Sequence, residues 1–154
     1  MDRTPRAPYL LGAAGLIPFA GLALLCLVPR LQPAWLGQPA WLGPEEARRA
    51  LALYGAVIAS FLGGIRWGLA VGRPAETTEW YDYTLSVVPS LLAWAALGLS
   101  PARALLALGA LILVWGLLDQ DLVRRPVAAP WFGRLRLALS AGAGLSLLAA
   151  GWFG

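Results

Sequence analysis

Residues 60 to 72 read SFLGGIRWGLAVG, an apolar run that contains four glycines and a single charged residue, Arg66. This stretch completes a mostly apolar segment that begins near residue 47. A hydrocarbon core about 30 Å thick is crossed by about 20 apolar helical residues. The segment 47–71 is therefore predicted to be a transmembrane helix, and it carries a permanent cation inside its apolar part.

The composition of the whole chain agrees with this interpretation. Of its 154 residues, 59% are hydrophobic and only 13% are charged, whereas a soluble domain carries about 25% charged residues. A soluble chain of this size needs a polar shell around its core, and this sequence lacks the residues to form one. The composition predicts an integral membrane protein.

Five apolar segments are separated by short polar connections. They predict a single all-α domain over 1–154, a transmembrane bundle with helices at about 8–28, 47–71, 83–99, 102–119 and 135–153. Ser100-Pro101 divides the third and fourth segments, and a proline suits the first turn of a new helix. The first segment is longer than the apolar core of a signal peptide, so we expect it to be retained.

The positive charges of the chain all belong to arginine. The arginines lie between apolar segments and form no basic domain, so we expect the lipid bilayer and no nucleic acid as a partner. Seven lie on the side of the N-terminus and four on the other side: Arg3, Arg6, Arg73, Arg124, Arg125, Arg134 and Arg136 against Arg30, Arg48, Arg49 and Arg103. Positive charges favour the cytoplasmic side, which predicts a bacterial inner-membrane protein with a cytoplasmic N-terminus and a periplasmic C-terminus.

Residue usage removes several kinds of chemistry. Histidine is absent and Cys26 is the only cysteine, so the common zinc, copper and haem ligand sets are missing. A serine–histidine hydrolase is excluded for the same reason. The acids form no recognisable catalytic motif, and we expect no metal, no cofactor and no enzymatic activity.

Small residues recur at every fourth position of the second predicted helix, ending in Ser60, Gly64, Gly68 and Gly72. The last helix has a similar series that includes Gly142. Because small residues let membrane helices approach closely, we expect both series at helix–helix contacts. The alternative is that they reflect only the abundance of glycine and alanine.

The connection between the first two helices contains a short duplication, PAWLGQPAWLG, at residues 33–43. Tryptophan is enriched where a membrane meets water. Trp35 and Trp41 are therefore predicted to be interfacial anchors.

Arg66 lies about 200° around the helix from the small-residue series and about 9 Å from the inner end, at 1.5 Å per residue. It can extend to the membrane surface as a snorkelling anchor, or it can face the bundle and pair with an acid. We expect pairing with Asp119, with Asp82 as the alternative partner. The predicted polar cluster at the inner end consists of Arg66, Asp82, Asp119, Arg134 and Arg136.

Four motifs resemble a known family of small, uncharacterised multi-helix membrane proteins that includes transmembrane-protein-69-like proteins. They are LGAAGLIPFAG, SFLGGIRWGLAVG, SVVPSLLAW and PWFGRLRLALS, in this order. The resemblance implies the fold and a membrane location, and it carries no biochemical activity. The family often has histidine at the position of Arg66, so this sequence departs from the family there.

Two classes of function remain open. In the first, the chain is an assembly, stabilising or accessory component of a membrane complex, with a membrane protein or a second copy as partner. Alternatively, it binds or transports a lipid, a quinone or a small anionic solute in a cytoplasm-facing pocket around Arg66.

Overall fold

A computed structural model describes residues 6–31 and 43–154 of the chain. The described residues form six α-helices and one 3-10 turn: α1 (Arg6–Leu31), α2 (Pro44–Val71), η2 (Ala75–Thr77), α3 (Trp80–Ala96), α4 (Pro101–Leu118), α5 (Gln120–Arg124) and α6 (Pro130–Phe153). The predicted all-helical membrane bundle is confirmed.

Local sequence signals account for most helix starts. Pro44, Pro101 and Pro130 stand in the first turn of α2, α4 and α6, where the missing N–H of proline costs no hydrogen bond. Glu79 and Asp82 form a capping box at the start of α3, which satisfies two otherwise unpaired backbone N–H groups. The last helix was predicted to begin at residue 135 and begins at Pro130 instead, with this proline in its first turn.

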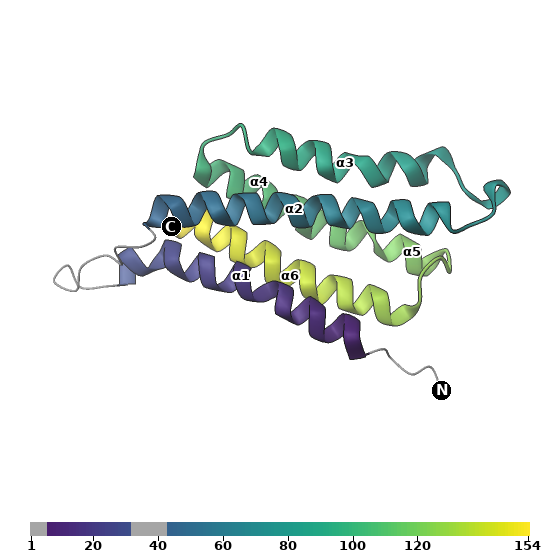
Figure 1. Ribbon diagram of the computed structural model, residues 1–154, viewed down its shortest axis with the longest axis horizontal. Coiled ribbons are helices and arrows are strands. Elements are labelled where there is room, and N and C mark those ends of the chain that lie inside the picture. Colours follow the sequence, from purple (N-terminus) through teal and green to yellow (C-terminus); the bar gives the residue numbers. More distant parts are fainter. Residues whose placement is uncertain (1–5, 32–42) are drawn as a thin grey trace.

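The five long helices run along the same axis of the molecule (Figure 1). Helices α2, α4 and α6 contact one another, α1 packs against α2 and α6, and α3 packs against α2 and α4. Among the described residues, α1 and α3 do not touch. The bundle therefore has a three-helix centre with one helix added on each side.

Four helical stretches are long and apolar enough to cross a membrane: Arg6–Leu27, Pro44–Val71, Pro101–Arg124 and Pro130–Phe153. The helix α3 has 17 residues and is shorter than the other long helices. It runs beside α2 over most of its length (Figure 1). The chain is a multi-helix membrane protein, and its long helices contact the lipid bilayer.

Glycines permit the close approach of α4 and α6. A Cβ atom at Gly109 would lie 3.0 Å from the carbonyl oxygen of Gly144, and a Cβ atom at Gly144 would lie 3.1 Å from that of Gly109. Any larger side chain would push the two backbones apart, so this crossing depends on glycine in both helices. Gly142 lies on another face of α6, against Leu16 of α1, and its expected place at a helix contact agrees with the structure.

The small-residue series of α2 divides into two halves. Its first part, Ala52 and Ala56, is buried in the core. Gly64 and Gly68 are exposed, and no atom of the described chain lies within 4 Å of a Cβ placed on either. Helix α2 meets α3 through Gly63 instead, which lies directly against the backbone of Ser86.

The expected helix contact at Gly64 and Gly68 is therefore wrong within this chain, because the buried face of α2 passes through Gly63 and Arg66. Ser60 is exposed on the same outer side, and Gly72 caps the end of α2. The predicted anchors Trp35 and Trp41 lie outside the described residues.

Candidate functional site

Three charged side chains meet in the interior of the bundle, and we call them the interior cluster: Arg66, Asp119 and Arg136. Arg66 donates from Nε to Oδ1 of Asp119 at 2.8 Å, and Arg136 donates from Nε to Oδ2 at 2.8 Å. The relative exposure of the three side chains is 2%, 1% and 5%. One carboxylate thus bridges two arginines that are almost completely removed from the surface.

Each member of the interior cluster is held by a different helix. Arg66 lies on the buried face of α2 with Leu62 and Gly63, which matches the three- and four-residue spacing of a helix face. Asp119 caps the C-terminus of α4. Arg66 also donates from Nη2 to the carbonyl oxygen of Leu118 at 2.6 Å, where the negative end of the α4 dipole favours a cation.

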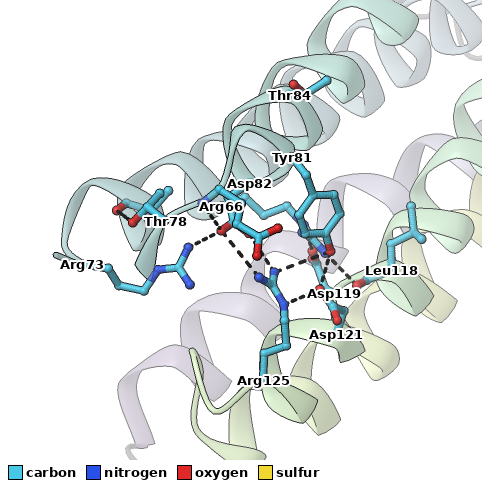
Figure 2. Close-up of polar contacts among 12 residues, drawn as sticks. Arg66, Arg73, Thr78, Tyr81, Asp82, Thr84, Leu118, Asp119, Asp121 and Arg125 are labelled. Carbon is cyan, nitrogen blue, oxygen red and sulfur yellow. Dashed lines mark hydrogen bonds and ion pairs between the residues drawn. The ribbon is translucent and has the colours of Figure 1, made fainter. Parts of the chain in front are cut away.

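A second group of polar side chains lies at the start of α3 and around α5, and we call it the rim cluster: Arg73, Tyr81, Asp82, Asp121 and Arg125. Figure 2 shows Asp82 between the guanidinium groups of Arg73 and Arg125. Arg125 donates to Asp82 Oδ1 at 2.7 Å and to Asp121 Oδ2 at 2.8 Å. Tyr81 donates its hydroxyl to Asp121. These contacts join α3 to α5 and to the connection that follows α2.

The rim cluster shifts the pKa values of three of its members, and that of Arg125 is raised, chiefly by its hydrogen bond to Asp82. Burial alone raises the pKa of Asp82, but hydrogen bonds from Arg125 and Arg73 outweigh it and lower this pKa from 3.8 to about 2. Burial and the hydrogen bond to Asp121 raise the pKa of Tyr81, against the opposing charge of Arg125. Asp82 is therefore ionised, and Tyr81 neutral, at physiological pH.

The structure places the predicted polar residues in two clusters where the sequence predicted one. Arg66 pairs with Asp119, the partner favoured by the sequence, and Arg136 joins them. Asp82 belongs to the rim cluster. Arg134 is exposed on α6 and makes no contact with either cluster, because it lies on the opposite side of that helix from Arg136.

A cavity of about 550 Å³ lies between α1, α2 and α6, with Ile112 of α4 also in its wall. Its lining is apolar except for two side chains, Arg136 and Ser140. The exposed residues Leu11 and Phe61 also line it, so the cavity opens toward the outside of the bundle. The predicted pocket around Arg66 is thus wrong in detail: the cavity adjoins Arg136, and Arg66 stands behind it in the interior cluster.

Several buried donors of this region lack a hydrogen-bond partner among the described residues. Arg136 Nη2 and Ser140 Oγ are both without one, and so are Arg66 Nη1 and Trp115 Nε1. Buried polar groups in proteins are nearly always hydrogen-bonded. Arg136 and Ser140 both line the apolar cavity, and the Ser140 hydroxyl lies close to Gly116 of α4.

Four of the contributing residues were not among the predicted site residues: Arg73, Tyr81, Arg125 and Ser140. Arg136 and Ser140 are four positions apart, which places them on one helix face, and this spacing was the available signal. No group of three or more His, Cys, Asp or Glu residues that could hold a metal ion occurs in the part of the chain that the structure describes.

Comparison with known proteins assigns the chain to a family. The model of a family described as "Protein of unknown function (DUF3429)" matches residues 4–151, nearly the whole sequence. This chain belongs to the DUF3429 family. Its resemblance to transmembrane-protein-69-like proteins is also shown, by two relatives with that printed name.

"Transmembrane protein 69" of Xenopus tropicalis is 39% identical to this DUF3429 chain over 149 residues, which cover 94% of the chain and 53% of the relative. The Mus musculus protein of the same name is 32% identical over 137 residues, covering 87% and 51%. The DUF3429 chain thus spans about half the length of these curated relatives. No solved structure matches it. The names of both relatives describe membrane proteins.

Proposed function

We propose that this protein is a non-enzymatic membrane protein that binds an amphipathic, membrane-soluble molecule in the cavity between α1, α2 and α6. Ligand sites have volumes of about 300–1,000 Å³ and apolar walls with a few polar groups that fix orientation. The cavity of about 550 Å³ with Arg136 and Ser140 in its wall fits this description. Its opening toward the lipid side gives a membrane-soluble molecule a direct entry.

The observation that carries the proposal is the pair of buried donors without a partner, Arg136 Nη2 and Ser140 Oγ. An unsatisfied buried donor costs about 1–3 kcal/mol, so an acceptor that reached these two donors would stabilise the protein. An oxygen atom of a bound head group would accept hydrogen bonds from both donors. The apolar part of the molecule would lie along α1 and α6.

The proposal is tested by filling the cavity from α1. Gly15 lines it, and a Cβ atom there would meet only the hydroxyl of Tyr54 at 3.8 Å. Gly15→Leu should therefore occupy the cavity without disturbing the fold, and native mass spectra of gently solubilised protein should lose a bound small molecule. Gly21→Leu is the matched control, since Gly21 lies on the same helix, has open space around it and does not line the cavity. Equal ligand adducts in both variants would contradict the proposal.

A second candidate function, assembly with another membrane chain, is favoured by the outer face of α2. Gly64 and Gly68 leave a smooth, exposed strip there, and membrane helices associate through such strips. Its simplest form is a second copy of this chain. Gly64→Cys should then give a disulfide-linked dimer in membranes, whereas native Cys26 is buried and should not. Failure to cross-link would rule out a homodimer through this face.

We also propose that the chain lies in a bacterial inner membrane with its N-terminal side in the cytoplasm and its C-terminus in the periplasm. The arginine asymmetry supports this orientation. The start of α1 and the end of α6 lie at opposite ends of the bundle (Figure 1), which supports termini on opposite sides of the membrane. A reporter active only in the cytoplasm should work when fused ahead of Arg6 and fail when fused after Gly154. Activity at both ends would contradict the proposed topology.

A further inference from the structure

The interior cluster has more positive than negative charge. Arg66 and Arg136 contribute one positive charge each and Asp119 contributes one negative charge, so the cluster keeps a surplus of at least one positive charge. Arginine cannot lose its proton in a protein, so a change in protonation cannot remove the surplus. No other acid is paired with these two arginines in the part of the chain that the structure describes.

The surplus charge lies beside the cavity, because Arg136 is one of its lining residues. Arg136 uses Nε for Asp119 and leaves Nη2 without a partner, and the same guanidinium lines the cavity. Ser140 follows one helical turn later and lines the cavity too, with its own hydroxyl unpaired. Asp119 therefore acts as a positioning residue, because its hydrogen bond from Arg136 Nε holds this guanidinium beside the cavity.

From this charge balance we infer that the molecule bound in the cavity is an anionic amphiphile. Its head group, a carboxylate or a phosphate, accepts hydrogen bonds from Arg136 Nη2 and Ser140 Oγ and neutralises the surplus charge. Its hydrocarbon part fills the apolar remainder of the cavity. The inference rests on the proposed function and adds to it the sign of the ligand charge.

Other ligand classes satisfy only part of the site. A neutral carbonyl compound such as a quinone would accept the hydrogen bonds but would leave a buried positive charge uncompensated, which is costly. A cationic amphiphile would be repelled. A small free anion would leave the apolar wall between α1 and α6 uncovered.

The test compares probes that share one hydrocarbon chain. Dibrominated stearate, the matching alkyl phosphate and the matching alcohol quench tryptophan fluorescence on contact, and Trp131 lines the cavity. With the purified full chain in an uncharged detergent, we expect saturable quenching, with both anions binding about ten- to a hundredfold more tightly than the alcohol, the effect of a hydrogen bond to a charged group. Acetate and inorganic phosphate should not compete at similar concentrations. Trp131→Phe should remove most of the saturable signal.

Variants of single residues test which side chains cause the preference for an anionic probe. Arg136→Gln should bring the affinities for stearate and alcohol to within about threefold of each other, and Ser140→Ala should weaken stearate binding several-fold with little effect on the alcohol. Arg134→Gln also removes one positive charge, but from the exposed side of α6. It should change neither the affinity for stearate nor the affinity for the alcohol. If Arg136→Gln does not fold, the affinities of the parent protein for the three probes and the effect of Ser140→Ala still test whether the ligand is anionic.

The possible outcomes separate the two proposals. Saturable binding of the alcohol as tight as that of the anions would overturn the anionic ligand and leave the cavity as a binding site. Absence of saturable binding for all three probes would overturn both. A preference of stearate over the phosphate, or the reverse, would identify which head group the site takes. Competition by acetate or inorganic phosphate alone would replace the amphiphile with a small solute.

Discussion

The interior cluster and the rim cluster share one motif, a buried aspartate held between two arginines. Around Asp119 the two arginines are 2% and 5% exposed, whereas Arg73 and Arg125 around Asp82 are 20% and 31% exposed. The rim cluster also contains Asp121, so its two arginines face two acids. The interior cluster has no second acid in the described structure. Both clusters contain buried arginine nitrogens without a partner: Arg66 Nη1 and Arg136 Nη2 in the interior cluster, and Arg73 Nε in the rim cluster.

This difference separates a structural role from a binding role. Arginines that reach the surface are neutralised by their own acids and by solvent, so the rim cluster needs nothing more to join α3 to α5. Arg66 and Arg136 are shielded from solvent and share one acid, Asp119. The positive charge that this acid leaves unbalanced is the basis of the anionic ligand proposed above.

The largest expected effect is that of Asp119→Asn. It leaves two enclosed arginines without their acid and should lower the free energy of unfolding by about 5 kcal/mol, the upper end for breaking a buried ion pair. Denaturation of the purified protein in detergent measures it. Asp121→Asn, two residues along and half-exposed, is the control and should cost about 1 kcal/mol or less. Similar losses for both variants would remove the distinction between the clusters.

Arg66→Leu should have the next largest effect, a loss of about 3 kcal/mol. The cost is lower because Asp119 keeps Arg136 as its partner, so the variant breaks one of two pairs. The same unfolding measurement applies. A variant as stable as the parent protein would show that Arg66 is only an anchor at the membrane surface.

In the rim cluster, Asp82→Asn should lower the free energy of unfolding by only about 1 kcal/mol. The arginines that lose their partner are partly exposed and gain water in exchange, and ion pairs near the surface contribute little. Local hydrogen exchange at the start of α3 should report the change even when global stability hardly moves. A loss as large as that of Asp119→Asn would show that the rim cluster is as dependent on its acid as the interior.

The pH dependence of the rim cluster should be the smallest effect. The pKa of Asp82 is lowered from 3.8 to about 2, so its stabilising contribution is complete above about pH 4 and is lost as the pH falls toward 2. The stability difference between the parent protein and Asp82→Asn should therefore stay constant from pH 8 to pH 5. A difference that changes within this range would show that Asp82 titrates without the help of Arg73 and Arg125.

The helices were predictable because their signals are local. Apolar length marks α1, α2, α4 and α6, and proline marks the first turn of three of them. The short helix α5 was not predicted, since a single turn after Asp119 has no apolar period of its own. The outward turn of Gly64 and Gly68 could not be predicted either. Small residues at every fourth position fit a contact inside the chain and a contact with another chain equally well.

The sequence by itself determined that this protein lies in a membrane, that it is all-helical and that one permanent cation stands inside its second helix. These conclusions follow from the composition and from the lengths of the apolar segments. Only the tertiary structure decided that Arg136 and Ser140 line a cavity while Arg134 faces outward, and that Asp119 serves two arginines and Asp82 two others. The reason is physical: helix rotation and packing bring together residues 53 and 17 positions apart, and no pattern within a single helix encodes that meeting.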